Sequence, residues 1–390
     1  MSHTNIQSSD VRTTLARHIL ADGYDMVLDL EKSHGSYLID KITKREYLDF
    51  FTFFASNPLG MNHPALVNDE FIGRIGKAAI NKPSNSDIYT EYMAEFMETF
   101  ERVGIPDYLP HAFFISGGAL AVENAMKVAF DWKVQKNFER GYREEKGHLV
   151  LHFEHAFHGR TGYTLSVTNT VPDKVKYFPK FKWPRVISPA NHYPETEESV
   201  EHVEKHEHLA IEQAKRYFDI HIDEIACILI EPIQAEGGDR HFRQDFHKEL
   251  RKLADTYEAL LIYDEVQTGV GLTGKFWAHE HFVEPDIIAF GKKAQVCGIL
   301  AGKRLDEVET NCFKVSSRIN STWGGNLVDM VRFQRILEVI EHDNLVENAA
   351  NLGDYLLDGL HRLSAKHAHF SNPRGKGLMC AIDLPSAHAR

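Results

Sequence analysis

Residues 259–292 constrain the fold of this chain more than any other stretch. They contain two short apolar runs, Leu260–Tyr263 and Ile287–Phe290, and each run is followed by a polar residue. Apolar runs of this length, bounded by turn signals, are typical of strands buried on both faces of a parallel sheet. The ligand crevice of an open α/β sheet lies outside the carboxyl ends of its strands. The sequence therefore predicts that Asp264 and Lys292 meet at that edge, either as a catalytic carboxylate and amine or as a buried ion pair.

Other patterns extend the alternation of strands and helices. Apolar strands are predicted at His148–Phe153 and Ile225–Ile230, and the segment after the second strand has apolar residues at helical spacing from Phe246 to Tyr257. A strand, an amphipathic helix and a second strand form a βαβ unit that leads directly to Asp264. The sequence therefore predicts an α/β protein.

Three further segments are assigned to structure rather than to a ligand site. Tyr37–Phe50 alternates apolar and polar residues around a charged turn, which predicts a hairpin. The aromatic run Phe50–Phe54 is predicted to be buried. Asn326–Lys366 is predicted to be long and helical, with core candidates Met330, Ile336, Leu337, Ile340, Leu352, Leu356 and Leu360.

Composition excludes several classes of function. The formal net charge of −12 over 390 residues argues against nucleic acid as the main partner, because phosphate contacts require clustered Lys and Arg. The cysteines lie far apart without a C-x-x-C pair, which argues against a disulfide framework or a zinc ribbon. No apolar run reaches about 18 residues, so no membrane span is expected. We therefore expect a cytoplasmic protein with no nucleic-acid or membrane partner.

A glycine turn and a histidine group are the next candidate sites. Ser116-Gly117-Gly118-Ala119 follows an apolar strand and precedes a helical segment, and such a turn either cups an anion at the helix start or is a turn alone. His152, His155 and His158 recur every third residue, but on an extended segment they would not share a face, and no thiolate accompanies them. We expect no metal there; a histidine-bound metal hydrolase is the alternative.

The residues of these motifs resemble those of a known protein family. D-E-V-Q-T-G at Asp264–Gly269 and P-D-I-I-A-F-G-K at Pro285–Lys292 resemble the active-site signature of the class III (ω-amino acid) aminotransferases. Within that family, A-F-G-K-K-A-Q-V-C-G and S-S-R-I-N-S-T-W-G-G-N are most similar to the lysine 6-aminotransferases. The resemblance implies the fold of the fold type I transferases: a mostly parallel seven-stranded sheet with helices on both faces, plus a smaller α+β domain.

The resemblance also implies the cofactor, pyridoxal 5'-phosphate, and the residues that hold it. The family lysine lies six residues after the Asp of the Pro-Asp pair, so the count from Asp286 selects Lys292 rather than Lys293 as the Schiff-base lysine. The other implied cofactor-binding residues are Gly118 and Ala119 at the phosphate, Phe157 and Val266 on the ring faces, Asp264 at the pyridine nitrogen, Gln267 at the ring hydroxyl, and Ser321 and Thr322 at the phosphate of a partner subunit. Lys292 and Asp264 are the expected catalytic residues.

The implied reaction transfers the ε-amino group of L-lysine to 2-oxoglutarate and gives L-2-aminoadipate 6-semialdehyde and L-glutamate. Arg160 is expected to bind a substrate carboxylate, Gln267 to lie beside the substrate, and Glu236 to offset a second arginine. Another class III aminotransferase, acting on ornithine, acetylornithine or 4-aminobutyrate, and a truncated inactive homologue are the alternatives. The family habit is a homodimer.

The resemblance finally implies a division of the chain. Residues 1–64 are expected to form an N-terminal arm and hairpin that contribute to the small domain. Residues 65–323 are expected to form the large cofactor-binding domain. Chains of the family continue beyond the point at which this sequence stops, so the small domain at 324–390 is expected to be incomplete and to lack the second substrate arginine.

Overall fold

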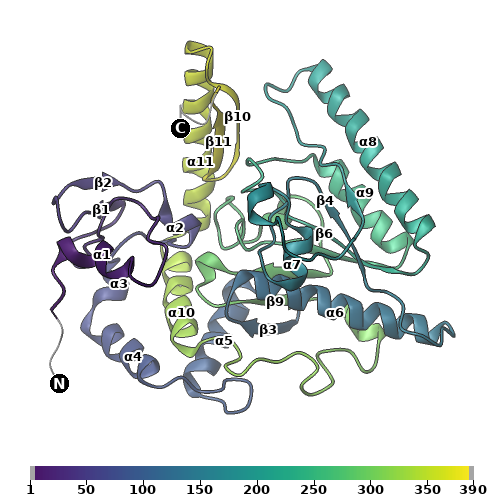
Figure 1. Cartoon of the computed structure of the whole chain (residues 1–390), viewed down its shortest axis with the longest axis horizontal. Helices are drawn as coiled ribbons and strands as arrows, with labels where there is room; N and C mark the ends of the chain where they lie inside the picture. Colours follow the sequence, from purple (N-terminus) through teal and green to yellow (C-terminus); the bar gives the residue numbers. More distant parts are fainter. Residues whose placement is uncertain (1–4, 386–390) are drawn as a thin grey trace. The chain divides into compact units, whose positions relative to one another are not determined.

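The computed structural model describes residues 5–385 and separates them into two units, Met1–Lys77 and Ala78–Arg390 (Figure 1). The elements of the first unit are η1 (Ser8–Asp10), α1 (Val11–Leu15), β1 (Tyr37–Ile39), β2 (Glu46–Leu48), α2 (Thr52–Ala55) and α3 (Pro64–Val67), and α4 (Asp69–Ile80) runs past its end. The division at 64 and 323 expected from the sequence stays a prediction.

The first unit contains the predicted hairpin. β1 and β2 pair antiparallel, with Tyr37 opposite Leu48. The turn between them is organised by Asp40, whose carboxylate accepts hydrogen bonds from the amides of Val27, Ile42 and Thr43. These hydrogen bonds, with that of the Thr43 hydroxyl, hold the pKa of Asp40 well below its usual value.

The prediction that Phe50–Phe54 is buried is wrong. Phe50 is 84% exposed and Phe54 is 72% exposed. Residues 52–55 all have positive φ, so the backbone turns sharply and the consecutive rings fan out. Phe51 is the centre of the group, with edge-on contacts to Phe53 and Phe54. Four phenylalanines within five residues on such a turn cannot all face one core.

The second unit is built on a seven-stranded sheet with the order β3-β9-β8-β7-β6-β4-β5. The strands are β3 (His111–Ile115), β4 (Leu149–Phe153), β5 (Arg185–Val186), β6 (Ile225–Ile230), β7 (Leu260–Asp264), β8 (Ile287–Phe290) and β9 (Cys297–Ala301). Neighbours pair in parallel from β5 to β8, and β9 is antiparallel to both of its neighbours. The mostly parallel sheet predicted from the sequence is confirmed.

Helices cover both faces of this sheet (Figure 1). The helices of this unit are α5 (Glu91–Gly104), α6 (Gly118–Glu139), α7 (Gly162–Val167), α8 (Glu197–Ile220), α9 (Gln244–Thr256), α10 (Leu327–His342) and α11 (Leu345–Lys366), with short helices η2 (Pro172–Lys174), η3 (Ala278–His281), η4 (Lys292–Ala294) and η5 (Lys303–Glu307). Of these, α11 packs on the hairpin of β10 (Ser371–Lys376) and β11 (Met379–Asp383) instead of the large sheet. Among the described residues, no helix combines the length and the apolar character that a membrane crossing requires.

The alternation of side chains along each strand separates the two faces. Ile262 and Ala289 belong to the core cluster that packs on α6. Phe290 points the other way and contacts Phe100 of α5, with ring centroids 5.6 Å apart. Burial on both faces explains why these strands are apolar throughout, with β6, β7 and β8 buried at every position.

The helical prediction for 326–366 holds, but the three core assignments in α11 fail. Met330, Ile336, Leu337 and Ile340 of α10 are buried, whereas Leu352 of α11 is 48% exposed and Leu356 and Leu360 are only partly buried. The buried positions of α11 are Ala349 and Gly353, which lie four residues apart on one side. A Cβ on Gly353 would come within 2.4 Å of the Gly377 Cα, so α11 packs through small residues against the hairpin of β10 (Ser371–Lys376) and β11 (Met379–Asp383).

Candidate functional site

The two polar residues that follow the apolar runs lie at the same edge of the sheet. β7 and β8 are parallel neighbours, and Asp264, the last residue of β7, is opposite Ala289 of β8. Lys292 follows the end of β8 by two residues, so both side chains belong to the carboxyl edge, where such sheets bind ligands. Asp264 also exerts an electrostatic effect on the Lys292 amine. The structure therefore places both residues at the edge that the rule for buried strands predicted, and their roles there stay predictions.

Asp264 is held by groups that fix the orientation of its carboxylate. His158 Nδ1 lies 2.8 Å from Oδ2, and the Val266 amide donates to Oδ1 at 3.0 Å. Asp264 is 5% exposed, and the other ring nitrogen of His158, Nε2, is buried without a hydrogen-bond partner among the described residues. Each carboxylate oxygen thus has one of these two hydrogen bonds, and one imidazole nitrogen of His158 is left for a bound group.

The two adjacent lysines have different surroundings. Lys293 is buried, and its Nζ donates to the Gln267 carbonyl at 2.6 Å. Lys292 is partly buried, and the charges that act on its amine are the carboxylates of Asp264, Glu231 and Glu236. Burial lowers the pKa of Lys292, and these carboxylates partly oppose that effect. The Lys292 amine therefore lies within electrostatic range of the carboxylates that end or follow β6 and β7, whereas the Lys293 amine is bonded to the segment after Asp264.

A second carboxyl group, Glu231, follows β6 at the same edge. It is buried and accepts hydrogen bonds from the amides of Phe157 at 2.9 Å and Ala235 at 3.3 Å. Burial raises the pKa of Glu231 to about 7; His158 and the two amides oppose the shift, and Asp264 adds to it. A carboxyl group next to the site therefore titrates near neutral pH.

The glycine turn forms a close-packed cradle beside Val266. Gly117 has φ +114° and precedes α6, which begins without a side-chain cap, so its first amides are left for a ligand. A Cβ on Gly118 would lie 2.8 Å from Val266 Cγ1. A Cβ on Gly159, at φ +119°, would lie 2.4 Å from the Ala119 Cβ. The predicted phosphate loop, the ring-face residue Val266 and the loop after β4 are therefore in contact.

Phe157 and Gln267 lie on the loops that end at this edge. The Phe157 amide is fixed by Glu231, and its ring is partly buried. Gln267 follows Asp264 by three residues, and its carbonyl is fixed by Lys293. Both residues stay candidates for contact with the cofactor.

The predicted substrate residues are more exposed. Arg160 precedes α7 and is exposed, and it forms no hydrogen bond or ion pair with any described residue. Glu236 lies after β6 and accepts a hydrogen bond from the Thr170 hydroxyl at 2.7 Å. It also forms an ion pair with Lys174, a residue that no motif identified.

Ser321 and Thr322 are placed on a separate surface loop. Ser321 Oγ accepts from the Gly324 amide at 3.1 Å, and the Ser321 carbonyl accepts from Ser86 Oγ at 3.0 Å. Thr322 is exposed. Within residues 5–385 of one chain, no hydrogen bond links this loop to Asp264 or Lys292.

The histidines that recur at every third residue lie in different environments. His152 is buried, with its pKa lowered to about 3 by burial, and its Nε2 receives a hydrogen bond from Arg185. His155 is exposed, and His158 is bound to Asp264. No group of potential ligands with metal-binding geometry occurs in the described part of the chain.

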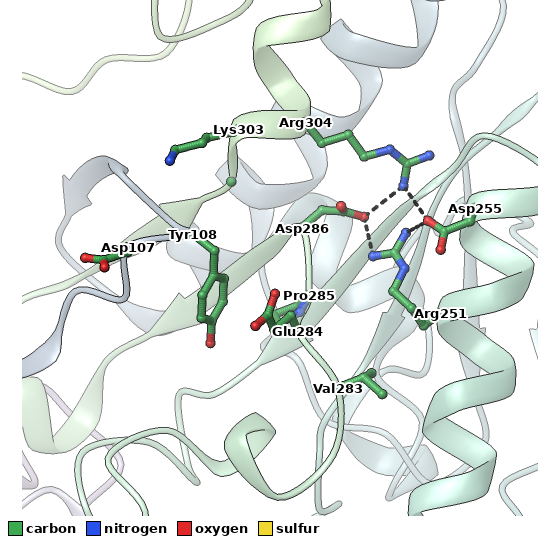
Figure 2. Close-up of a pocket in the computed structure, with 11 residues that line it drawn as sticks. Asp107, Tyr108, Arg251, Asp255, Val283, Glu284, Pro285, Asp286, Lys303 and Arg304 are labelled. Atoms are coloured by element: carbon green, nitrogen blue, oxygen red, sulfur yellow. Dashed lines mark hydrogen bonds and ion pairs between the residues drawn. The ribbon is translucent and has the colours of Figure 1, made fainter.

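A cavity of about 770 Å³ lies at the opposite edge of the sheet, where β8 begins (Figure 2). Four of its charged residues pair with one another: Asp286 Oδ2 lies 2.8 Å from Arg251 and 3.3 Å from Arg304, and both arginines also contact Asp255. The Asp286 carboxylate also accepts from the Leu261 amide at 2.7 Å. The Asp of the Pro-Asp pair therefore joins the starts of β7 and β8, and this cavity is not where Asp264 and Lys292 lie.

Sequence reasoning missed His158, Glu231 and Lys174. Glu231 obeys the rule that found Asp264, because it directly follows a buried parallel strand. His158 was examined only as a metal ligand, although it lies beside Phe157 in the same loop. Nothing in the sequence marks Lys174, which belongs to a proline-bounded excursion.

Comparisons of this chain with known families, proteins and solved structures all find aminotransferases. The family described as aminotransferase class-III matches residues 19–390. L-lysine-epsilon aminotransferase of Mycobacterium tuberculosis is 55% identical over 97% of this chain and 85% of that protein. The mitochondrial 4-aminobutyrate aminotransferase of Homo sapiens is 30% identical over 95% of this chain and 77% of that protein. A solved structure, "Lysine aminotransferase from M. tuberculosis in the internal aldimine form", has a TM-score of 0.96 at 54% identity and covers 99% of this chain and 88% of that chain.

Proposed function

Because this chain belongs to the class III aminotransferases, which are pyridoxal-phosphate-dependent enzymes of fold type I, we propose that it transfers the ε-amino group of L-lysine to 2-oxoglutarate. The products are L-2-aminoadipate 6-semialdehyde and L-glutamate. The observation that carries the choice of lysine is the 55% identity, over nearly the whole chain, to a relative named for that activity. Relatives named for 4-aminobutyrate are 34% and 30% identical.

The residues at the carboxyl edge fit pyridoxal phosphate. The uncapped start of α6 at Gly118 and Ala119 suits a phosphate. The glycines at 118 and 159 let this turn pack directly against Val266 and the loop after β4, because an added Cβ would collide with Val266 or Ala119. Asp264 would pair with the pyridine nitrogen, Gln267 with the ring hydroxyl, and Lys292 with the aldehyde carbon. The cofactor ring would lie between the Phe157 ring on one face and the Val266 methyl groups on the other. When bound, the cofactor acts as an electron sink for the carbon that loses its proton.

The contribution of Lys292 follows from its surroundings. A lysine at its ordinary pKa is a weak nucleophile near neutral pH, and burial lowers the pKa of Lys292. The neutral amine is the form that can react with a carbonyl carbon, and once a substrate amine has displaced it, the freed amine can accept the proton from the carbon that carries the substrate amine. Lys293 holds the Gln267 carbonyl and so keeps Lys292 directed at the strand ends.

His158 is a positioning residue for Asp264. Its hydrogen bond to Oδ2 and the Val266 amide on Oδ1 hold the carboxylate in one orientation. An ordered carboxylate keeps a ring nitrogen protonated without having to reorient during the reaction.

The remaining assignments belong to the same proposal. Arg160, exposed and without a partner among the described residues, binds a substrate carboxylate through its planar donor fork. Thr322, with Ser321, reaches the cofactor phosphate of a second subunit in a homodimer; the exposure of Thr322 supports this role. The enzyme acts in the cytoplasm.

The test compares amino donors with one acceptor. The purified protein is incubated with 2-oxoglutarate and with L-lysine, ornithine, acetylornithine or 4-aminobutyrate, and kcat/KM is measured for each donor. Lysine is expected to give the highest value and 2-aminoadipate 6-semialdehyde as product. Ornithine turnover equal to or better than lysine turnover would overturn the assignment.

A matched pair of variants tests the lysine assignment and the inactive alternative. The visible absorption band of bound pyridoxal phosphate is expected to disappear in Lys292→Ala and to persist in Lys293→Met. A band that persists in Lys292→Ala but is lost in Lys293→Met would shift the register by one residue. A wild-type protein that stays colourless with added pyridoxal phosphate would support the inactive alternative.

A further inference from the structure

Glu123, a partly buried residue of helix α6, holds the Arg160 loop, which comprises residues 159–163. Glu123 Oε1 accepts a hydrogen bond from the Thr161 hydroxyl at 2.7 Å and another from the Tyr163 amide, also at 2.7 Å. Thr161 directly follows Arg160 in the chain, and Tyr163 lies in the first turn of α7. One carboxylate oxygen therefore fixes the backbone after Arg160 and the start of the next helix.

Two further contacts join the Arg160 loop to the same face of α6. Gly159 lies so close to this helix that an added Cβ would come within 2.4 Å of the Ala119 Cβ. The Tyr163 ring meets the Phe130 ring edge-on, with the ring centroids 5.8 Å apart. Ala119, Glu123 and Phe130 lie four and then seven residues apart, so their side chains project from one side of the helix. The Arg160 loop is therefore docked along α6 at both of its ends.

The Arg160 side chain takes no part in these contacts. It is exposed, and it forms no hydrogen bond or ion pair with any described residue. A ligand that binds a long side chain on a mobile backbone must order both, which costs conformational entropy. With the backbone already fixed, only the side-chain torsions of Arg160 remain to be ordered. The residues that hold the loop therefore set the place from which the guanidinium group reaches a ligand.

The helix that holds the Arg160 loop is also the helix that begins at the proposed phosphate site. Glu123 lies five residues after Gly118, and the first amides of α6 have no side-chain cap. The phosphate site and the clamp on the Arg160 loop thus belong to the first two turns of one rigid helix. A charged acceptor such as Glu123 makes the stronger kind of hydrogen bond, which suits a clamp at the surface.

We infer that Glu123 is a positioning residue for Arg160, and that it sets the distance between a bound substrate carboxylate and the cofactor by holding the backbone beside the arginine. This inference rests on the proposed aminotransferase function, in which Arg160 binds a substrate carboxylate, and adds the residue that places this arginine. Glu123 acts on substrate binding, whereas the phosphate site is formed by the backbone of α6 itself. Loss of Glu123 therefore weakens carboxylate binding and leaves cofactor binding nearly unchanged.

The test measures the binding of glutarate, an unreactive dicarboxylate, to the cofactor-loaded protein by calorimetry. Glu123→Leu removes the acceptor of both hydrogen bonds, and Glu123→Gln keeps an acceptor oxygen in the same place. Thr161→Val removes the hydroxyl donor from the other side, and it decides the question if Glu123→Leu does not fold. Glu139→Leu is the matched control, because Glu139 is an exposed glutamate at the far end of the same helix.

Glu123→Leu is expected to weaken glutarate binding by about tenfold, Thr161→Val by about threefold, and Glu123→Gln by less than about twofold. The KM for 2-oxoglutarate should rise in the same order with little change in kcat, because the lost contact serves binding. Pyridoxal phosphate affinity should be nearly unchanged in every variant, and Glu139→Leu should match the wild type. Unchanged glutarate binding in both Glu123→Leu and Thr161→Val would overturn the inference. An equal loss of cofactor and glutarate affinity would also overturn it, because that result indicates general disruption of α6.

A double-mutant cycle shows whether Glu123 acts through Arg160. Arg160→Met is expected to weaken glutarate binding, and in that background Glu123→Leu should add less than about a twofold loss. A full further loss in the double variant would overturn the inference, because Glu123 would then act independently of the arginine. If Arg160→Met alone leaves glutarate binding unchanged, the role of Arg160 in the proposed function fails too; an effect of Arg160→Met without one of Glu123→Leu refutes the inference alone. Glutarate does not react, so these outcomes do not depend on which amine is the donor.

Discussion

Glu231→Gln isolates the energetic cost of burying a carboxyl group beside the cofactor site. The pKa of Glu231 is raised from 4.5 to about 7, mainly by burial. A group with a raised pKa in the folded state stabilises the fold most below its unfolded pKa, and this contribution is lost as the pH rises to the folded value. At about 1.4 kcal/mol per pKa unit, the shift corresponds to about 3 kcal/mol, lost between about pH 4.5 and pH 7. Glutamine keeps the shape and an acceptor oxygen but does not ionise.

The expected result is a change in the relative stability of the two proteins with pH. Near pH 4.5 the difference in the free energy of unfolding between the two proteins is set by the substitution itself. Above about pH 7 the free energy of unfolding of Glu231→Gln, relative to that of the wild type, should be higher by about a further 3 kcal/mol, the full value of the shift. For a cooperative unit of about 300 residues this corresponds to a relative shift of about 4 °C in Tm. Calorimetric scans of both proteins across this range measure the shift, and infrared difference spectra detect the protonated carboxyl group directly. A pH-independent Tm difference, together with a carboxyl group that is already ionised at pH 5.5, would refute the reasoning.

Three further substitutions test the packing and the positioning of the site. Gly159→Ala should weaken pyridoxal phosphate binding by about tenfold or more, because φ is +119° and the added Cβ would overlap the first turn of α6; equilibrium dialysis of the cofactor checks it. Gly353→Ala should lower the Tm by several degrees, because the added Cβ would lie 2.2 Å from the Gly377 carbonyl. Gly359→Ala on the same helix is the control: its added Cβ would lie 3.8 Å from the nearest atom, on the Arg362 side chain, and the Tm should be unchanged or higher. His158→Phe should reduce kcat on the order of tenfold with little change in the KM for lysine, and steady-state kinetics that show only a KM effect would contradict a positioning role.

Much of the sheet was predictable because it is buried on both faces. Such strands are continuous apolar runs, so their positions and their carboxyl ends could be read directly, and Asp264 and Lys292 were located by that rule. The prediction of buried residues failed where contacts between elements, and not helical spacing, decide which side chain is buried. Leu352 fits a helical stripe, but α11 approaches its hairpin through Gly353, so the leucine stays exposed.

The residues that the sequence did not reveal act through contacts between distant segments. His158 and Asp264 are 106 residues apart, and Lys174 and Glu236 are 62 apart. Periodicity and spacing describe one element at a time, so they identify a side chain that ends a strand but not the side chain that holds it. The positive φ at 52–55, which scatters the phenylalanine rings, likewise has no signal in a run of apolar residues.

The ends of three adjacent strands give this edge its electrostatic character. β6 ends in Glu231, β7 in Asp264, and β8 leads to Lys292. Two ionised carboxylates would both raise the pKa of the lysine, but burial raises the pKa of Glu231 to about 7, so near neutral pH much of the Glu231 population is uncharged. A neutral Glu231 raises the pKa of Lys292 less than an ionised one would, which favours the neutral amine that the proposed reaction requires. Asp264, the other acidic group at these strand ends, is hydrogen-bonded to His158 and is the group that we propose for the ring nitrogen.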